Sequence, residues 1–241
     1  MHSAQGGDQV GRVIGLWRYP VKSMAGEAMS ACDVSWHGIT GDRRWAFIKP
    51  DAVQSGFPWL TLRERPDMHH YRASFLDPMQ PEKSATVVRT PSGAELEVSD
   101  PTLAVELGAA SVIRQNRGVF DTFPLSLITI ETIAEIGEWI GTSLGTDRFR
   151  PNILVEAHSG MPFAEDDWVG QVLRIGSARL RIDKRDGRCA VITIDPVTTE
   201  RNPEVLRRVA QERGGCAGVY GTTCDPGRVA LGDAVTLAAP A

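Results

Sequence analysis

The stretch Arg188-Cys189-Ala190-Val191-Ile192-Thr193-Ile194-Asp195-Pro196 joins a charged segment to an apolar, β-branched run. A run of this kind predicts a buried strand that begins where the polar loop 183–188 ends. The loop carries three cations, and cations beside a thiol favour the thiolate, which binds soft metals and attacks electrophiles. A free cysteine is also common as a small, buried, apolar residue. Both interpretations of Cys189 remain open on these residues alone.

The composition is that of an ordinary globular protein. The 241 residues are enough for one or two domains with a substantial core, and the proportions of 42% apolar and 23% charged residues exclude a disordered chain. The net charge of −4 gives no reason to expect nucleic acid as a partner. Local basic clusters still matter, because an anionic small molecule responds to the charges of its own pocket.

The cysteines point to a reduced protein. Four cysteines are too few for a disulfide scaffold, and no two of them form a Cys-x-x-Cys pair. This spacing excludes zinc ribbons, thioredoxin-like redox pairs and iron–sulfur clusters held by this chain. No apolar run reaches the roughly 18 residues that cross a membrane, and residues 1–9 do not resemble a signal peptide. We therefore expect a cytoplasmic protein with no membrane partner.

Many short strands and few helices are predicted, which favours a mainly β, barrel-rich architecture. Helices are expected at 102–107, 131–140 and 204–212, where capping residues, prolines or glycines mark their ends. Strands are expected at 10–18, 28–36, 45–48, 60–64, 68–76, 85–90, 94–98, 111–115, 125–130, 153–155, 168–175, 178–182, 190–194, 219–222 and within 227–237.

The sequence pattern changes near residue 120. We therefore expect an N-terminal β subdomain over residues 10–120 and a C-terminal β-barrel domain over residues 121–241. The two are expected to pack closely, because no flexible linker joins them.

Three cation-bearing loops share one design, in which a polar loop lies against the end of an apolar strand. They are residues 20–23, 42–44 and 148–152. An anionic cofactor that carries phosphate needs such groups, because guanidinium binds oxyanions through two parallel donors and lysine adds a point charge. The amide of Asn152 both donates and accepts, which suits the edge of a heterocycle. The alternative is that these are solvated surface charges, and the sequence alone does not show that the loops converge.

Other polar clusters are not expected to bind metal. His69 and His70 are neighbours in an expected strand, so their side chains would point to opposite faces. The carboxylates of residues 165–167 lack the spacing and glycine of a calcium loop, and we expect a solvated loop there. Cys216 and Cys224 are expected to be structural.

Five motifs in order resemble the signatures of one family. They are Tyr19-Pro20-Val21-Lys22-Ser23, Gly41-Asp42-Arg43-Arg44-Trp45, Arg148-Phe149-Arg150-Pro151-Asn152, Arg188-Cys189 with Asp195-Pro196, and Tyr220-Gly221 with Gly232-Asp233-Ala234-Val235. The chain is similar to MOSC proteins (molybdenum cofactor sulfurase C-terminal domain) that carry the family's N-terminal β-barrel domain. Within that family it resembles the amidoxime-reducing components. The match runs over residues 10–237.

The resemblance implies a molybdenum cofactor, Mo-molybdopterin, with Cys189 as the metal ligand. It implies that Asp121 lies close to the metal and is catalytic. It also implies a set of residues that hold the pterin and its phosphate, namely Lys22, Ser23, Arg43, Thr122, Arg148, Arg150, Asn152 and Arg188. Phe123 stands where the family often has serine, and Thr122 is the candidate to replace that hydroxyl.

The implied activity is that of a molybdenum-dependent oxidoreductase that reduces N-hydroxylated or N-oxide substrates by oxygen-atom removal. Electrons would come from a separate redox protein, either ferredoxin-like or cytochrome b5-like with a reductase. Two alternatives stay open: a carrier of molybdenum cofactor without turnover, and a sulfur-transfer protein in which Cys189 carries a persulfide.

Overall fold

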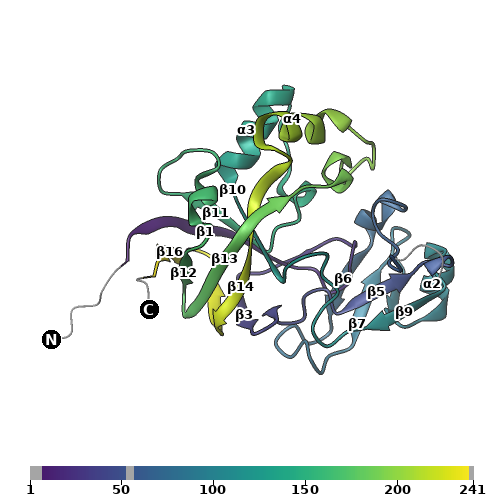
Figure 1. The fold of residues 1–241 in the computed structure, drawn as a ribbon. Helices are drawn as coiled ribbons and strands as arrows, with labels where there is room; N and C mark the ends of the chain where they lie inside the picture. The colour runs from purple at the N-terminus through teal and green to yellow at the C-terminus, as the bar shows by residue number, and fades with distance from the viewer. Residues whose placement is uncertain (1–6, 53–56, 239–241) are drawn as a thin grey trace.

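A computed structural model describes residues 7–52 and 57–238, and a closed barrel of seven strands is the largest unit within them. The strand order is β11-β10-β14-β13-β12-β16-β1, and antiparallel pairing of β1 with β11 closes the ring (Figure 1). The strands are β1 (Gln9–Arg18), β10 (Leu125–Thr129), β11 (Ile153–Ala157), β12 (Val172–Ile175), β13 (Ala178–Gly187), β14 (Cys216–Asp225) and β16 (Ala234–Leu237). The pairing of β10 with β11 is parallel. Inward-facing aliphatic side chains such as Leu127, Ile153 and Leu180 fill the barrel.

Two helices cover one side of the barrel, α3 (Ile130–Ile140) and α4 (Pro203–Arg213) (Figure 1). They pack on each other and on the outer side chains of the barrel, which explains why every residue of β10 is buried. The Thr129 side chain caps α3 by accepting from the Thr132 backbone N–H, and Asn202 caps α4 in the same way. Both helices end at a glycine in the left-handed conformation.

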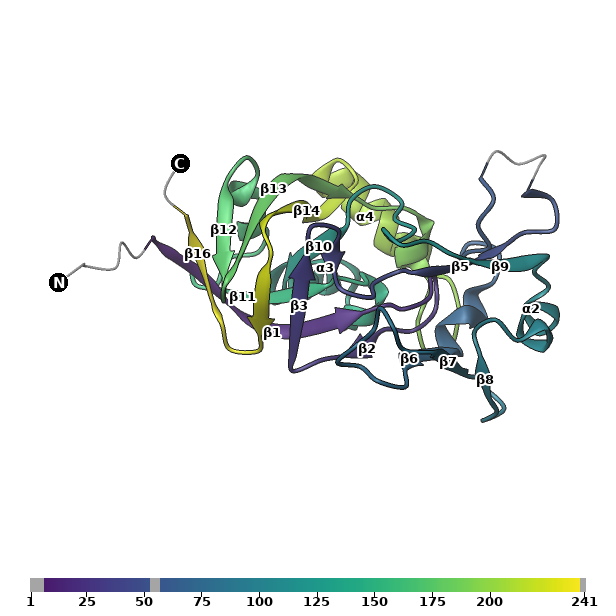
Figure 2. The same ribbon diagram turned by 90° about the horizontal axis from the view of Figure 1, so that it is seen from below.

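A smaller β-rich part lies at the end of the molecule opposite β12 and β16, as Figure 2 shows. It contains the pair β5 (Trp45–Ile48) and β9 (Ser111–Arg114), the sheet β6 (Arg72–Phe75), β7 (Thr86–Arg89) and β8 (Glu95–Glu97), the 3₁₀ helix η1 (Pro66–His70) and α2 (Pro101–Leu107). A separate apolar core holds these elements together, with Phe47, Met68 and Leu103 fully buried. A third sheet joins β15 (Gly227–Ala230), β3 (Ala31–Ser35) and β4 (Gly38–Ile39), and β2 (Glu27–Ala28) pairs with the end of β1.

The mainly β, barrel-based fold class expected from the sequence is confirmed. The three expected helices are also present, with α2 capped by Asp100 and ended by Gly108 as the sequence indicates. The division at residue 120 stays a prediction. Three strand pairings cross it, because β1 pairs with β11 and β16 in the barrel and β3 pairs with β15.

Two strand predictions, 60–64 and 190–194, are wrong, and the expected strand 68–76 is present only over β6 (Arg72–Phe75). The run 190–194 begins as a 3₁₀ helix, η4 (Ala190–Thr193), in which the Thr193 hydroxyl donates to the Ala190 carbonyl over 2.7 Å. The charged segment expected as a loop instead forms the end of β13, in which Lys184 is exposed and Asp186 is buried. Residues 61–64 form a turn, and residues 66–70 form η1. A short β-branched run is apolar in either conformation, so its composition does not separate a strand from a buried turn.

The expected loop at 51–59 is only partly placed, since residues 53–56 lie outside the described residues. In the described parts of the chain, no helix has the length and apolar character needed to span a membrane.

Candidate functional site

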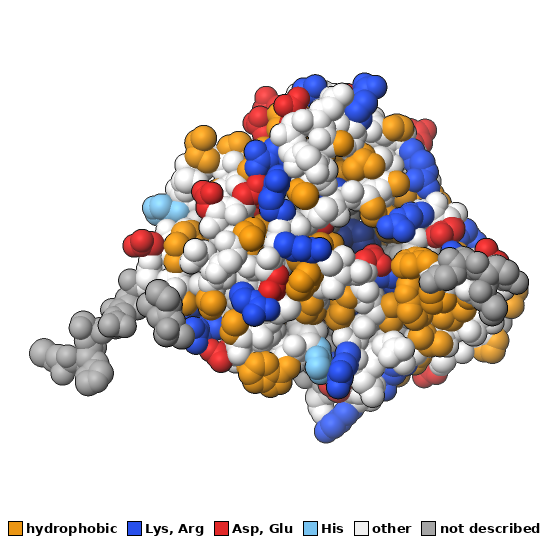
Figure 3. Space-filling view, viewed as in Figure 1, with side chains coloured by type: hydrophobic (Ala, Val, Ile, Leu, Met, Phe, Trp, Pro, Cys, Tyr) orange, Lys and Arg blue, Asp and Glu red, His pale blue; other side chains and the backbone are white. Residues whose placement is uncertain are grey.

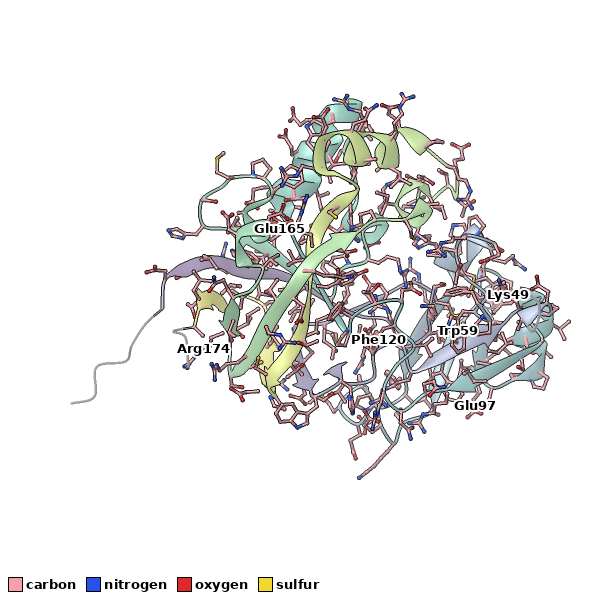
Figure 4. The ribbon with its side chains drawn as sticks, in the orientation of Figure 1. Lys49, Trp59, Glu97, Phe120, Glu165 and Arg174 are labelled. Atoms are coloured by element: carbon pink, nitrogen blue, oxygen red, sulfur yellow. The ribbon has the colours of Figure 1, made fainter. Side chains whose placement is uncertain are left out.

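A pocket lies where the barrel meets the smaller β-rich part, and both contribute to its walls. It holds about 860 Å³ of space between atoms, including space that is open to solvent. Figure 3 shows this hollow near the middle of one face, with lysine and arginine side chains inside it, and Figure 4 places Phe120 at the junction. We call it the central pocket.

All ten site residues expected from the sequence line the central pocket. They are Lys22, Ser23, Arg43, Asp121, Thr122, Arg148, Arg150, Asn152, Arg188 and Cys189. The three cation-bearing loops therefore converge, which the sequence alone did not show. The chemical role of each residue stays a prediction.

The backbone is strained where the loops enter the pocket. Ser23, Arg43 and Arg150 have positive φ angles of 69°, 48° and 53°, a region that disfavours residues with a side chain. Such strain costs about 1–3 kcal/mol per residue and concentrates at binding sites. Here it turns the side chains of the three loops toward one space.

Tyr19 ties two of these loops together. Its ring lies beneath the guanidinium groups of Arg43 and Arg150, whose carbons are 4.8 and 4.4 Å from the ring centre. Its hydroxyl donates to the Pro151 carbonyl over 2.9 Å. Burial raises the pKa of Tyr19, an effect that the two arginines only partly oppose. The neutral phenol is therefore a fixed support, a role that the sequence analysis did not assign.

Asn152 lines the pocket and is held by a hydrogen bond to Asp42, which lies behind the pocket lining. The Asp42 carboxylate is buried, pairs with the Arg43 guanidinium, and accepts from the Asn152 side-chain amide over 3.1 Å. The Asn152 side-chain oxygen accepts from the Ser126 backbone N–H over 3.2 Å. This network fixes the orientation of both side chains before any ligand binds.

Lys22 and Asp121 form an ion pair on another wall. The Lys22 Nζ lies 2.7 Å from Asp121 Oδ1 and donates to the Val119 carbonyl over 3.2 Å. Burial lowers the pKa of Lys22, and the charge of Asp121 acts in the opposite direction. The lysine side chain is 5% exposed and the aspartate 55%, so the pair runs from the interior toward solvent.

Arg148 and Arg188 flank the segment that carries Cys189. Arg148 pairs with Asp195 over 2.8 Å and donates to the Ile192 carbonyl, which holds η4 in place. Arg188 pairs with Asp186 over 3.1 Å and donates to two backbone carbonyls. Each guanidinium keeps one buried nitrogen, Arg148 Nε and Arg188 Nη2, that has no hydrogen-bond partner among the described residues. Donor capacity therefore remains on both sides of the cysteine.

Arg150 differs from these cations. Its side chain is half-buried and, within the described chain, forms neither an ion pair nor a hydrogen bond. Burial lowers the pKa of Arg150 to about 10, with Arg43 acting in the same direction. It therefore remains charged at neutral pH. A partly buried cation without a counter-charge is unfavourable, and an anionic ligand in the pocket would supply the missing charge.

Cys189 is partly exposed in the pocket and precedes η4 in an extended backbone conformation. A hydrogen bond to its side chain raises the pKa of Arg63, which is an exposed residue of the turn 61–64. The sequence analysis assigned no role to Arg63, because it treated residues 60–64 as a strand. The fold places this arginine against the cysteine.

Asp186, Ser126 and Tyr220 are further pocket residues that the sequence analysis missed. The Asp186 carboxylate is 2% exposed and accepts from the Ser126 hydroxyl over 3.1 Å. Burial raises the pKa of Asp186, against the effect of Arg188. The Tyr220 ring stacks on Phe123 with a 5.8 Å centroid separation, so Phe123 forms an aromatic wall.

The acidic segment 165–167 is not a solvated loop, which corrects the sequence-based expectation. Glu165 is fully buried, and its carboxylate accepts from the hydroxyls of Thr129 (2.7 Å) and Thr132 (2.9 Å). Its neighbour Asp166 pairs with Arg185 over 2.9 Å and also with Arg213. Glu165 is therefore buried as the acceptor for the hydroxyls of Thr129 and Thr132. Figure 4 shows Glu165 on the helix-covered side of the barrel.

The histidine pair lies in η1 and not in a strand. His69 is buried, and burial lowers its pKa to about 3. His70 Nε2 lies 2.9 Å from the Val197 carbonyl. No group of three or more His, Cys, Asp or Glu side chains suited to a metal ion occurs among the residues described.

Comparison with known proteins agrees with this geometry. The MOSC domain matches residues 114–236, and the MOSC N-terminal β-barrel domain matches residues 10–147. The chain is 24% identical to mitochondrial amidoxime-reducing component 1 of Homo sapiens, over 95% of this chain and 83% of that protein. It is 40% identical to molybdenum cofactor sulfurase of Anopheles gambiae over 84 residues, which are 33% of this chain and only 10% of the sulfurase.

A solved structure shows the same fold. The YuaD protein of Bacillus subtilis superimposes with a TM-score of 0.53 and 16% sequence identity, over 95% of each chain. The two family domains together span the barrel, the smaller β-rich part and the central pocket. These matches confirm the resemblance inferred from the motifs, and the chain belongs to the MOSC family, with the N-terminal β-barrel domain of that family preceding and overlapping the MOSC domain.

Proposed function

We propose that this protein is a molybdenum-cofactor-dependent oxidoreductase that removes an oxygen atom from N-hydroxylated or N-oxide substrates. One observation carries the proposal: a partly exposed thiol, Cys189, shares a pocket with a half-buried cation, Arg150, that forms no ion pair with the described residues. The relatives named for molybdenum cofactor sulfuration and amidoxime reduction support the same cofactor.

The residues of the central pocket fit such a cofactor. Cys189 supplies a soft sulfur ligand suited to a metal already bound by sulfur. Arg150 and Lys22 offer a planar guanidinium and a point charge for phosphate. The unpartnered nitrogens of Arg148 and Arg188 are further donors for polar atoms of the pterin. Ser23, Arg43, Thr122 and Asn152 complete the proposed binding set.

The cofactor, when bound, would supply the two-electron chemistry of oxygen removal. For a hydroxylamine the balance is R–NH–OH plus two electrons and two protons, giving R–NH₂ and water. Asp121 is proposed to hold one of these protons, because its carboxylate is at the solvent end of the pair with Lys22. The fixed arginines would hold the cofactor, and the stacked rings of Phe123 and Tyr220 form one side of the pocket.

Electrons are proposed to come from a separate redox protein, ferredoxin-like or cytochrome b5-like with a reductase. The likeness to an amidoxime-reducing component supports an electron-transfer partner of this class. The cytoplasmic location expected from the sequence belongs to the same proposal.

The test is the molybdenum and pterin content of the protein purified from a host that makes the cofactor. We expect stoichiometric molybdenum in the wild type and in Cys216→Ser, and its loss in Cys189→Ser. Chemically reduced wild type should convert benzamidoxime to benzamidine. Protein that lacks molybdenum, or that holds it equally well in Cys189→Ser, would contradict the proposal.

The same measurements separate the two alternatives. Molybdenum-free protein that gains a labile sulfur on Cys189 would favour persulfide transfer, for which the likeness to the sulfurase is the supporting observation. Protein that retains the cofactor but turns over no N-hydroxylated or N-oxide compound would favour a carrier.

A further inference from the structure

The central pocket has a second cation without a carboxylate partner, and it lies near the surface. Six cationic side chains line the pocket, namely Lys22, Arg43, Arg63, Arg148, Arg150 and Arg188, but only two acidic ones do, Asp121 and Asp186. Within the described residues, four of the six cations pair with an aspartate, while Arg63 and Arg150 do not. The pocket is therefore positive although the whole chain carries a net charge of −4.

The two unpaired cations differ in depth. Arg150 is half-buried on the ring of Tyr19 and belongs to the proposed cofactor set. Arg63 is exposed on the turn that begins at Thr61. Its guanidinium can therefore meet a molecule that enters from solvent.

The turn holds Arg63 in place. The Thr61 hydroxyl donates to the Glu64 carboxylate over 2.6 Å, and the Arg63 carbonyl accepts from the Arg201 guanidinium over 2.8 Å. Arg63 and Cys189 line the same pocket, and the interaction of the two side chains raises the pKa of Arg63. A thiol sulfur is a weak acceptor and a guanidinium has five donors, so most of the donor capacity of Arg63 is left for another acceptor.

The pocket that Arg63 lines has apolar walls. The Arg63 guanidinium lies over the Phe57 ring, 5.9 Å from the ring centre, and Leu62, Phe120 and Phe123 also line the pocket. Aromatic walls suit a flat, apolar group, and a guanidinium pairs best with a carboxylate, through two parallel hydrogen bonds.

We propose that Arg63 is a substrate-binding residue that selects N-oxygenated substrates carrying a carboxylate on a flat apolar group. Arg63 and the proposed metal ligand Cys189 line the same pocket, so the carboxylate would be held close to the reacting end of the substrate. This inference rests on the proposed function for its substrate class. Binding of a carboxylate by Arg63 does not depend on that function, because it follows from the position of Arg63 on the turn.

The test compares 4-carboxybenzamidoxime with neutral benzamidoxime on the holoenzyme. In Arg63→Gln, we expect the KM for the carboxylate to rise about tenfold or more, as for loss of a charge-assisted hydrogen bond. The KM for benzamidoxime should change less than twofold. Arg63→Lys keeps the charge but loses the two parallel donors of the guanidinium, so it should give an intermediate KM. Arg72→Gln, an exposed arginine outside the pocket, should behave as wild type.

A binding measurement keeps the test independent of turnover. Calorimetry with 4-amidinobenzoate should show weaker binding to Arg63→Gln than to wild type, with unchanged molybdenum content and melting temperature. Equal changes for the charged and neutral ligands, or no change for either, would overturn the carboxylate subsite. Loss of molybdenum in Arg63→Gln would also overturn it, because Arg63 would then serve the cofactor. Wild-type protein that turns over neither compound contradicts the proposed function, and the calorimetry then decides the inference alone.

Discussion

Replacement of Arg150 by methionine should have opposite effects on the empty protein and on its cofactor complex. A pKa of about 10 instead of 12.5 means that folding disfavours the charged guanidinium by at most about 3 kcal/mol. Loss of the contact with the Tyr19 ring removes about 1–2 kcal/mol of favourable cation–π energy. The net effect of Arg150→Met on the empty protein is an increase of about 1 kcal/mol in the free energy of unfolding, or roughly 2–4 °C in melting temperature.

The cofactor complex should weaken in the same variant. Hydrogen bonds to a charged group contribute about 1.5–3 kcal/mol, which corresponds to roughly 10- to 100-fold in affinity. The assay is urea unfolding at pH 7 of protein from a host unable to make molybdopterin, together with the molybdenum content of protein from a competent host. The matched control is Arg12→Met, because Arg12 is an exposed arginine paired with Glu156 and lies outside the central pocket.

Two results would refute this reasoning. One is an empty Arg150→Met protein that is less stable than wild type by more than about 1 kcal/mol, since the guanidinium would then stabilise the fold. The other is full molybdenum content in the variant, since Arg150 would then not hold an anionic group.

Two further predictions test the surroundings of the site. Between pH 6.5 and 5 His69 stays neutral in the folded protein but binds a proton in the unfolded chain, so the wild type should lose about 2 kcal/mol of stability over this range. Urea unfolding at both pH values should show no such loss in His69→Gln. An equal loss in the variant would contradict the prediction. In Gly218→Ala, a Cβ would lie 2.7 Å from a backbone oxygen and 3.0 Å from Arg188 Nη2. Because these atoms must move, we expect about 1–3 kcal/mol of destabilisation and, through Arg188, reduced molybdenum content. Gly214→Ala also has a positive φ but meets nothing within 4 Å, so it should lose stability without losing the metal, and equal molybdenum loss in both would contradict the argument.

The helices were predictable because their signals are local. The side chain of Asp100, the proline after it and Gly108 define α2 within a few residues, and the ends of α4 are marked in the same way. The barrel could be inferred only as a class, since closure depends on the pairing of β1 with β11, and no local pattern specifies partners so far apart in the chain.

The site was predictable as a set of motifs but not as a geometry. Each cation loop has an ordinary local sequence, and only the fold brings the loops to one pocket. Arg63 and Asp186 were missed for a related reason. The first lies in a turn that resembles a strand in composition, and the second has a buried carboxylate within a segment whose charges suggested a loop. Inward or outward orientation in such segments depends on strand register, which the sequence did not define.

The pairing of β1 affects the order in which the barrel can assemble. Its two barrel neighbours are β11 and β16, in the middle and near the end of the chain. During synthesis the ring therefore cannot close until β16 is available to pair with β1. The smaller β-rich part has its own core and does not depend on this closure. The loop that carries Lys22 follows directly from β1, so the pocket wall becomes fixed only when the barrel closes. Cofactor insertion is thereby expected only after β16 has been synthesised and paired with β1.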